Sequence, residues 1–197
     1  MKKACKRRIV VKIGTKVLAD MDGTYGLRRS VMKGLADQIS TAVNAGVEVV
    51  IVSSGAIGSG MGLLKRKERP KTLTQLQACA AVGQSHLMKA YDDCFRRHRI
   101  LTAQVLLTQD DLSENKRRLN AKGTLLALLK ERVVPIVNEN DTVATEEIRF
   151  GDNDQLSSLI ARLISADMLI LLSNIDGLYR YDAVTKKKEL LVTASYR

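Results

Sequence analysis

Small and polar residues directly follow several short apolar segments of this chain. The carboxyl ends of parallel strands meet at one edge of an open sheet, and ligands bind beyond that edge. If the apolar segments are such strands, the polar groups converge on one small-molecule site. The groups are, in chain order, Lys12 with Gly14 and Thr15, Ser53 to Ala56, Asn138 with Asn140 and Asp141, and Ser173 with Asn174 and Asp176.

Lys12 stands inside an apolar run, between Val11 and Ile13. A lysine at the end of a strand is often simply solvated, but one at this position must be buried or point into a cleft. Burying a cation without a partner is unfavourable. We therefore favour a functional role for Lys12 over a structural one.

The segment from Ser53 to Gly62 contains four glycines, in a form that looks at first like a dinucleotide-binding loop. The spacing is G-x-x-G-x-G and not G-x-G-x-x-G, and the segment follows the second apolar run instead of opening the chain. No Walker sequence occurs either. A helix N-terminus that binds an anion through free backbone amides is the better interpretation.

An acidic island interrupts this basic chain around Asp141, Asp152 and Asp154, with Glu139, Glu146 and Glu147 nearby. Carboxylates that lie close together at a sheet edge need cations, and the candidates are a substrate ammonium, Mg²⁺ or Lys12. The simpler alternative is that the Asp152-Asn153-Asp154 run caps a helix, because Asp and Asn are favoured at that position. We favour the functional alternative.

The histidines and cysteines support no other chemistry. No Ser or Cys is placed to pair with His86 or His98, so we interpret both as structural or exposed. Cys5, Cys79 and Cys94 are scattered, odd in number and without zinc-ligand spacing. We expect reduced thiols and no protein-bound metal site.

The pattern of apolar residues predicts an α/β fold with a largely parallel sheet covered by helices on both faces, because short β-branched runs alternate with longer stretches of helical spacing. Pro135 lies within one strand-like run, which suggests an edge position or a site where the amide is not needed. The interval Thr142–Phe150 is expected to be a small hairpin or a mobile loop. The predicted strands are Ile9–Ile13, Val47–Val52, Leu101–Leu107, Val133–Val137 and Met168–Leu172; the predicted helices are Leu27–Ala45, Leu73–Arg97, Lys116–Lys130 and Gln155–Ile164.

The 197 residues fit one domain spanning the whole chain, 1–197. The apolar runs are too short to span a bilayer and the N-terminus lacks the apolar region of a signal peptide, so a cytoplasmic location is expected. The net charge of +11 comes from small basic clusters without interleaved aromatic residues. This favours solvated helix ends and loops over a nucleic-acid surface. A positive field also attracts anionic metabolites such as ATP and dicarboxylates.

Taken together, the motifs resemble those of the glutamate 5-kinases of the amino-acid-kinase superfamily, from about Arg8 to about Leu190. Each motif alone is weak, but six in the right order and spacing are specific. The combination of N-E-N-D with G-D-N-D separates this branch from other members of the superfamily. The matching segments are Val10–Thr15, Val52–Ile57, Ala80–Ser85, Val137–Asp141, Gly151–Asp154 and Asp176–Tyr179.

The resemblance implies a three-layer amino-acid-kinase fold that phosphorylates the side-chain carboxylate of L-glutamate with MgATP, the first step of proline synthesis. It implies that Lys12 contacts the transferring phosphoryl group, where its charge offsets the developing negative charge. Asp154 would orient catalytic lysines, and Asp141 would take the substrate ammonium through a charge-assisted bond.

The resemblance further implies binding roles for other residues. The substrate would be bound by Ser54, Gly55, Asp141, Asn153 and Asp152. The nucleotide would be bound by Lys12, Gly14, Ser173 and Asn174, with Gly14 and Gly55 presenting backbone amides. The interval Thr142–Gly151 corresponds to a loop that folds over the substrate and takes part in feedback inhibition by proline. A homo-oligomer is also implied.

The chain departs from the family pattern toward its C-terminal end. Asn174 stands where Asp is common, and Asp182-Ala183 replaces the usual D-P pair. Nothing after Asn174 resembles the G-T-G-G-M segment with its second catalytic lysine. We therefore expect the C-terminal part of the sheet and the RNA-modification-type domain of many relatives to be missing, through truncation, omitted residues or degeneration. The alternative function is a non-catalytic protein that binds glutamate or proline.

Overall fold

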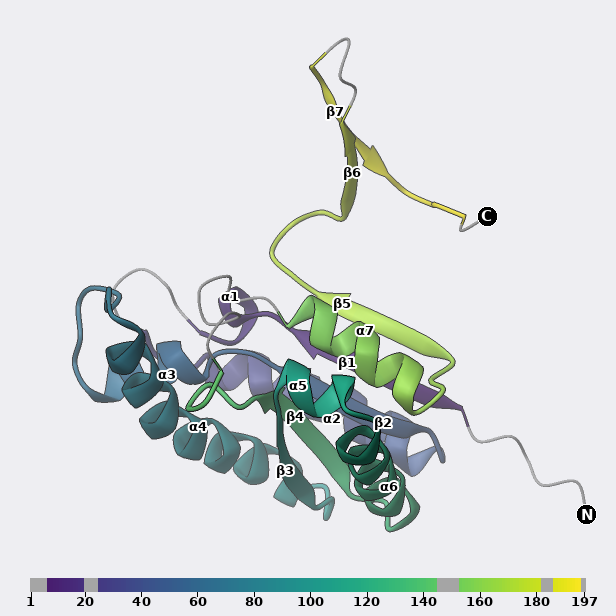
Figure 1. Ribbon diagram of the computed structural model, residues 1–197. Helices are drawn as coiled ribbons and strands as arrows, with labels where there is room; N and C mark the ends of the chain where they lie inside the picture. Colours follow the sequence, from purple (N-terminus) through teal and green to yellow (C-terminus); the bar gives the residue numbers. More distant parts are fainter. Residues whose placement is uncertain (1–6, 20–24, 145–152, 182–185, 196–197) are drawn as a thin grey trace, which may run out of the picture.

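A five-stranded parallel sheet forms the centre of the computed structural model, which describes residues 7–19, 25–144, 153–181 and 186–195. All four pairs of neighbouring strands are parallel, in the order β3-β4-β2-β1-β5. The predicted α/β fold is therefore confirmed, with each strand within two residues of its expected bounds (Figure 1). The strands are β1 (Arg8–Ile13), β2 (Glu48–Ser53), β3 (Thr102–Leu107), β4 (Val134–Glu139) and β5 (Met168–Leu172).

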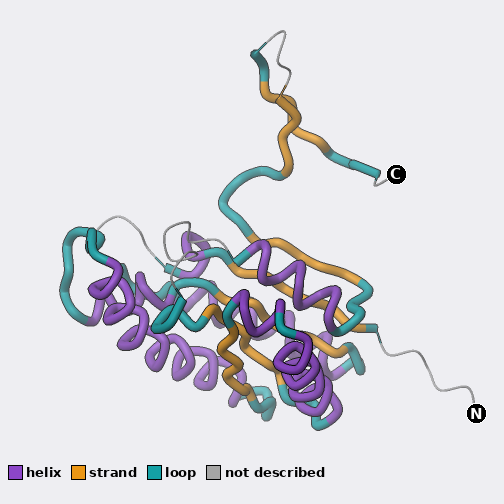
Figure 2. The backbone as a smooth tube through the Cα atoms, in the orientation of Figure 1, coloured by secondary structure: helices purple, strands orange, loops and turns teal. Residues whose placement is uncertain are grey.

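Helices cover both faces of the sheet and make three layers (Figure 2). Successive strand residues point to opposite faces, so the two faces have separate cores. Val11 and Ile51 pack with α2 (Arg29–Asn44) and α4 (Leu73–Arg96). Val10 and Val50 pack on the other side with α6 (Asn115–Lys130) and α7 (Asp154–Leu163). This two-sided burial is why the strands read as continuous apolar runs.

Three short helices directly follow strand ends. They are α1 (Thr15–Leu18) after β1, α3 (Ala56–Leu63) after β2 and α5 (Gln109–Ser113) after β3. Their extents were not predicted from the sequence, because four to eight residues carry too little apolar periodicity. The helix N-terminus expected in the Ser53–Gly62 segment is the start of α3. Since α1 and α3 begin where β1 and β2 end, they place their first residues at the sheet edge where the polar groups gather.

The helices α3 and α4 pack with their backbones in contact at two glycines. A Cβ atom on Gly60 would lie 1.8 Å from the carbonyl oxygen of Cys79, and one on Gly83 would lie 1.8 Å from that of Ala56. No side chain fits at either position. Gly83 therefore fixes how closely α4 approaches the start of α3.

The region after β5 extends away from the sheet. An antiparallel hairpin of β6 (Leu178–Tyr181) and β7 (Lys188–Leu191) projects from it (Figure 1). Met168 and Leu171 on β5 are 54% and 50% exposed, so the β5 side of the sheet presents apolar surface. Among the described helices, none combines the length and apolar character needed to cross a membrane.

Pro135 lies in an interior strand, so the edge alternative for this residue is wrong. It faces Ala103 of β3, and the register between β4 and β2 begins one residue later, at Ile136 opposite Ile51. Val134 and Asn140 donate their amides to carbonyls of Leu101 and Leu107 next to or on β3. The missing amide of Pro135 would therefore point toward β2, at a position before the pairing of β4 with β2 begins. Pro135 thus lies at a site where the amide is not needed, as the second alternative predicted.

Candidate active site

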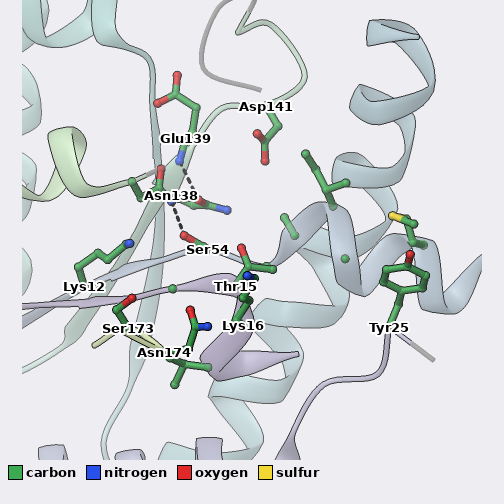
Figure 3. A pocket seen from close by; sticks show the side chains of 18 of the residues that line it. Lys12, Thr15, Lys16, Tyr25, Ser54, Asn138, Glu139, Asp141, Ser173 and Asn174 are labelled. Atoms are coloured by element: carbon green, nitrogen blue, oxygen red, sulfur yellow. Dashed lines mark hydrogen bonds between the residues drawn. The ribbon is translucent and has the colours of Figure 1, made fainter. Parts of the chain in front are cut away.

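A cavity of about 310 Å³ lies at the carboxyl ends of β1, β2, β4 and β5. This size is at the lower end of the range for small-molecule sites, roughly 300–1,000 Å³. Figure 3 shows Lys12 and Ser173 on one side of Ser54 and Asp141 on the other. Of the residues predicted for the site, the cavity brings together Lys12, Gly14, Ser54, Gly55, Asp141, Asn153, Ser173 and Asn174.

Asp154 is tied to the cavity through Lys12. Its Oδ1 atom lies 2.5 Å from the Lys12 Nζ atom, and the Lys12 side chain is only 8% exposed. The buried lysine therefore has the partner that its position in the apolar run required. Asp152 lies outside the described residues, as do Glu146, Glu147 and most of the interval Thr142–Gly151.

Asn153 connects three parts of the site from the start of α7. It occupies the N-cap position, but its side chain makes no capping hydrogen bond. Instead its Nδ2 atom donates its two hydrogens to the carbonyl oxygen of Ser53 (2.6 Å) and to Asn138 Oδ1 (2.8 Å), and Ser54 Oγ lies 3.2 Å away as a third, weaker acceptor. The helix-cap alternative is therefore wrong for the side chain of Asn153, which holds the ends of β2, β4 and α7 together.

The two predicted glycines contribute in different ways. Gly55 has φ of 100°, a left-handed conformation that favours glycine, and it is the N-cap of α3. The Gly14 amide donates to the carbonyl oxygen of Leu172 at 3.0 Å and extends the pairing of β1 with β5. That amide is engaged within the protein in this structure. Gly14 has no Cβ, which leaves space in the cavity beside Lys12. A Cβ at this position would lie 3.7 Å from the Lys12 Nζ atom.

Ser173 and Asn174 are exposed and line the cavity from the end of β5. The D-G turn that follows them leads into the hairpin, and Tyr179 donates its hydroxyl to Asp176 Oδ2 at 3.0 Å. That hydrogen bond raises the pKa of Tyr179 above its usual value. Asp176 therefore has a structural role in this turn, and it does not line the cavity.

Thr15 and Asn138, expected among the strand-end polar groups, also line the cavity, together with four polar residues to which no site role had been assigned: Lys16, Tyr25, Arg69 and Glu139. Glu139 is 6% exposed, and it stood only among the acidic residues near the predicted site. Lys16 comes from α1, and Arg69 comes from the loop between α3 and α4. The loop reaches the site by folding back, which no local pattern in the sequence indicates.

Both histidines have polar partners, and the expectation that no Ser is placed to pair with His86 was wrong. Its Nδ1 atom lies 2.9 Å from Ser59 Oγ, so a serine is placed to pair with it. Ser59 is 2% exposed and buried between α3 and α4, which gives the pair a structural role. His98 lies in the turn after α4, and its Nε2 atom is 2.6 Å from Asp37 Oδ1 on α2.

The thiols of Cys79 and Cys94 are free and buried. Burial raises the pKa of Cys94, against the opposing effect of Arg29. Across the described ranges, no group of three or more His, Cys, Asp or Glu side chains is arranged to hold a metal ion.

The family model for the amino acid kinase family matches residues 7–197, almost the whole chain. The chain belongs to the amino acid kinase family. Membership of this family accounts for both the fold and the order of the motifs.

Within this family, the chain is similar to bacterial proteins named glutamate 5-kinase. It is 53% identical to that of Nitrosomonas eutropha and 54% identical to that of Carboxydothermus hydrogenoformans, in each case over 89% of this chain and 47% of the relative. The protein from Moorella thermoacetica is 51% identical over 94% of this chain and 49% of the relative. The chain thus spans about half the length of the curated relatives it matches.

Proposed function

We propose that this chain carries the glutamate-binding part of a glutamate 5-kinase, which transfers a phosphoryl group from ATP to the side-chain carboxylate of L-glutamate. The observation that carries the proposal is the arrangement of charge in one cavity. Lys12 and Asp141 lie on opposite sides of Ser54 (Figure 3). An amino acid with its ammonium at Asp141 then extends its side-chain carboxylate toward Lys12. The names of the most similar relatives support the same reaction.

The reaction needs no general base, because a carboxylate nucleophile is already ionised at neutral pH. What remains is to hold two anions in line and to offset their repulsion. Lys12 supplies the positive charge, and its ion pair with Asp154 fixes where that charge lies. Lys16 and Arg69 line the same cavity and offset the second carboxylate of the substrate.

ATP would occupy the side of the cavity at the end of β5, with Gly14, Ser173 and Asn174 around it. These residues fit a nucleotide, because Gly14 leaves room by lacking a side chain, Ser173 offers a hydroxyl and Asn174 offers a side-chain amide. Mg²⁺ is usually held by phosphate oxygens with one or two carboxylates. Of the described carboxylates, Glu139 and Asp141 line the cavity, and Asp141 lies across Ser54 from Ser173 (Figure 3). The ion would therefore be held mainly by the phosphates, enter with the nucleotide and screen the phosphate charge.

A second candidate is a protein that binds glutamate or proline without phosphoryl transfer. It is favoured by one observation: among the described residues, the cations lining the cavity are Lys12, Lys16 and Arg69, and all precede β5. A MgATP titration of the chain by calorimetry separates the candidates. An affinity comparable to that for glutamate counts against a binding-only role.

Several properties stay predictions. Feedback inhibition by proline and a homo-oligomeric state rest on the resemblance. A cytoplasmic location, the absence of a nucleic-acid partner and the organisation of residues 1–197 as one domain rest on length, composition and sequence pattern. Proline lacks a side-chain carboxylate, so its competition with glutamate would use the Asp141 side of the cavity alone.

A hydroxylamine-trapping assay tests the proposed function. The protein that carries this chain is incubated with MgATP, hydroxylamine and either L-glutamate or L-glutamine. We expect hydroxamate with glutamate and none with glutamine, whose amide oxygen carries no charge to direct toward Lys12. Absence of glutamate-dependent turnover would refute the kinase function.

A further inference from the structure

The Gln84 side chain on α4 contacts Asn138 at the end of β4. Asn138 Nδ2 donates to Gln84 Oε1 at 2.9 Å. Gln84 in turn donates through Nε2 to Gln104 Oε1 on β3, at 3.4 Å. Asn138 is only 2% exposed. Gln84 therefore gives the buried amide nitrogen of Asn138 an acceptor inside the protein.

This contact supports one of the two orientations of the Asn138 amide. With Nδ2 directed at Gln84, the Oδ1 atom accepts from Asn153 Nδ2 at 2.8 Å and from the Glu139 backbone amide at 2.9 Å. The Glu139 amide can only donate, so it requires the same orientation. The Gln84 acceptor satisfies the Asn138 Nδ2 atom in this orientation and thereby stabilises the arrangement that Asn153 needs.

The packing of α4 explains why Gln84 reaches β4. The preceding residue, Gly83, lies against the backbone of α3, where a Cβ would be 1.8 Å from the Ala56 carbonyl oxygen. The close approach of the two helices fixes α4 at this point. The side chain of the next residue is then held beside the end of the sheet.

We propose that Gln84 is a positioning residue for substrate binding, which acts through Asn138 to hold Asn153 beside Ser54 in the cavity. The inference deepens the proposed function and rests on it, because the cavity of Asn153 and Ser54 is the one assigned to glutamate. Gln84 does not line that cavity, so its effect on the ligand is transmitted by the two asparagines.

Two variants separate the acceptor from the rest of the side chain. Gln84→Glu keeps an oxygen that accepts from Asn138 Nδ2, whereas Gln84→Met fills similar space without an acceptor. Gln104→Met is the matched control, because it removes the other hydrogen-bond partner of Gln84. Gln84→Ala gives the same comparison as Gln84→Met if the methionine variant does not fold.

The first readout needs no ligand. In ¹H–¹⁵N spectra of the side-chain amides, Q84M should shift the Asn153 signal and Q84E should leave it near its wild-type position, as should Q104M. An unmoved Asn153 signal in both Q84M and Q84A overturns the inference, whether or not glutamate binds.

The second readout is calorimetric titration with L-glutamate. Q84M should bind roughly tenfold more weakly than wild type, the size expected when a buried donor loses its acceptor, while Q84E and Q104M should bind within about threefold of wild type. Wild-type affinity in Q84M overturns the positioning role. A wild-type chain that does not bind glutamate, but whose Asn153 signal responds to Q84M, refutes the proposed function and leaves the Gln84 contact established.

Discussion

The ammonium of Lys12 at the end of β1 lies 2.5 Å from Asp154 Oδ1 at the start of α7. The lysine side chain is 8% exposed and the aspartate side chain 46% exposed. The cation is therefore buried, and the paired Oδ1 atom is buried with it although the rest of the carboxylate is open to solvent. An unpaired buried charge is strongly unfavourable. The pair therefore permits a cation inside the sheet edge and fixes its location in the cavity.

Replacing Asp154 by Asn should reduce phosphoryl transfer while leaving the fold intact. The amide has nearly the same size but no charge, so Lys12 is no longer held at the reacting group. We expect the kcat for hydroxamate formation to fall by about 10²–10³-fold, as when one electrostatic contact to a transition state is lost. Asp110→Asn, at an exposed carboxylate on α5, is the control and should retain wild-type activity.

Lys12→Met combined with Asp154→Asn extends this prediction. Residues that act as a unit lose activity together, so the double variant should be little worse than Lys12→Met alone. Losses that simply add would show that the two residues act independently and would contradict the account.

Adding a methyl group at Gly83 should strongly destabilise the protein. The Cβ of Gly83→Ala would lie 1.8 Å from the Ala56 carbonyl oxygen, so α3 and α4 must separate. We expect a loss of at least about 3 kcal/mol in the free energy of unfolding, measured in urea. Gly123→Ala on α6 is the matched control, since a Cβ there meets nothing within 4 Å. It should raise stability by roughly 0.5–1 kcal/mol; equal effects of both changes would contradict this packing.

The capping box at the start of α5 makes a pH-dependent contribution to stability. The Asp111 carboxylate accepts from the Thr108 backbone amide at 2.9 Å. That bond lowers the pKa of Asp111 below 3.8, against partial desolvation, which raises it, and with help from the Thr108 hydroxyl and Arg117. Because the pKa is lowered in the folded state, the contribution is present above pH 3.8 and is lost as the pH falls through the lowered pKa.

Urea unfolding of wild type and Asp111→Ala over a pH series measures this contribution. The variant should be less stable by about 1 kcal/mol at pH 7. The difference should shrink below pH 3.8. A difference that is constant down to pH 3 would show that the carboxylate charge is not involved.

The sheet and the strand-end residues could be predicted because burial on both faces leaves a direct pattern in the sequence. Lys12 was recognisable because a lysine inside an apolar run is costly without a partner. Lys12 was one candidate cation for the acidic island, but Asp154 was singled out within that island only by resemblance, since nothing local to either residue indicates which strand and helix ends meet.

Other parts of the site depend on packing that a single sequence does not express. Asn153 occupies a helix N-cap, and its residue type suits a cap, so only the fold shows its side chain turned to Ser54 and Asn138. Arg69 lies in a basic loop that resembles an ordinary solvated segment until the chain folds back to the cavity. Gln84 belonged to a recognised motif without an assigned role, because its partner lies on β4.

Calorimetric titration of the 197-residue chain with L-glutamate, beside its Asp141→Asn variant, measures whether this cavity binds glutamate. We expect saturable binding to the wild-type chain and an affinity at least about tenfold lower for the variant, because a charge-assisted bond to the substrate ammonium is lost. Absence of saturable binding by the wild-type chain, or equal affinity of the two proteins, would contradict the assignment of this cavity to glutamate.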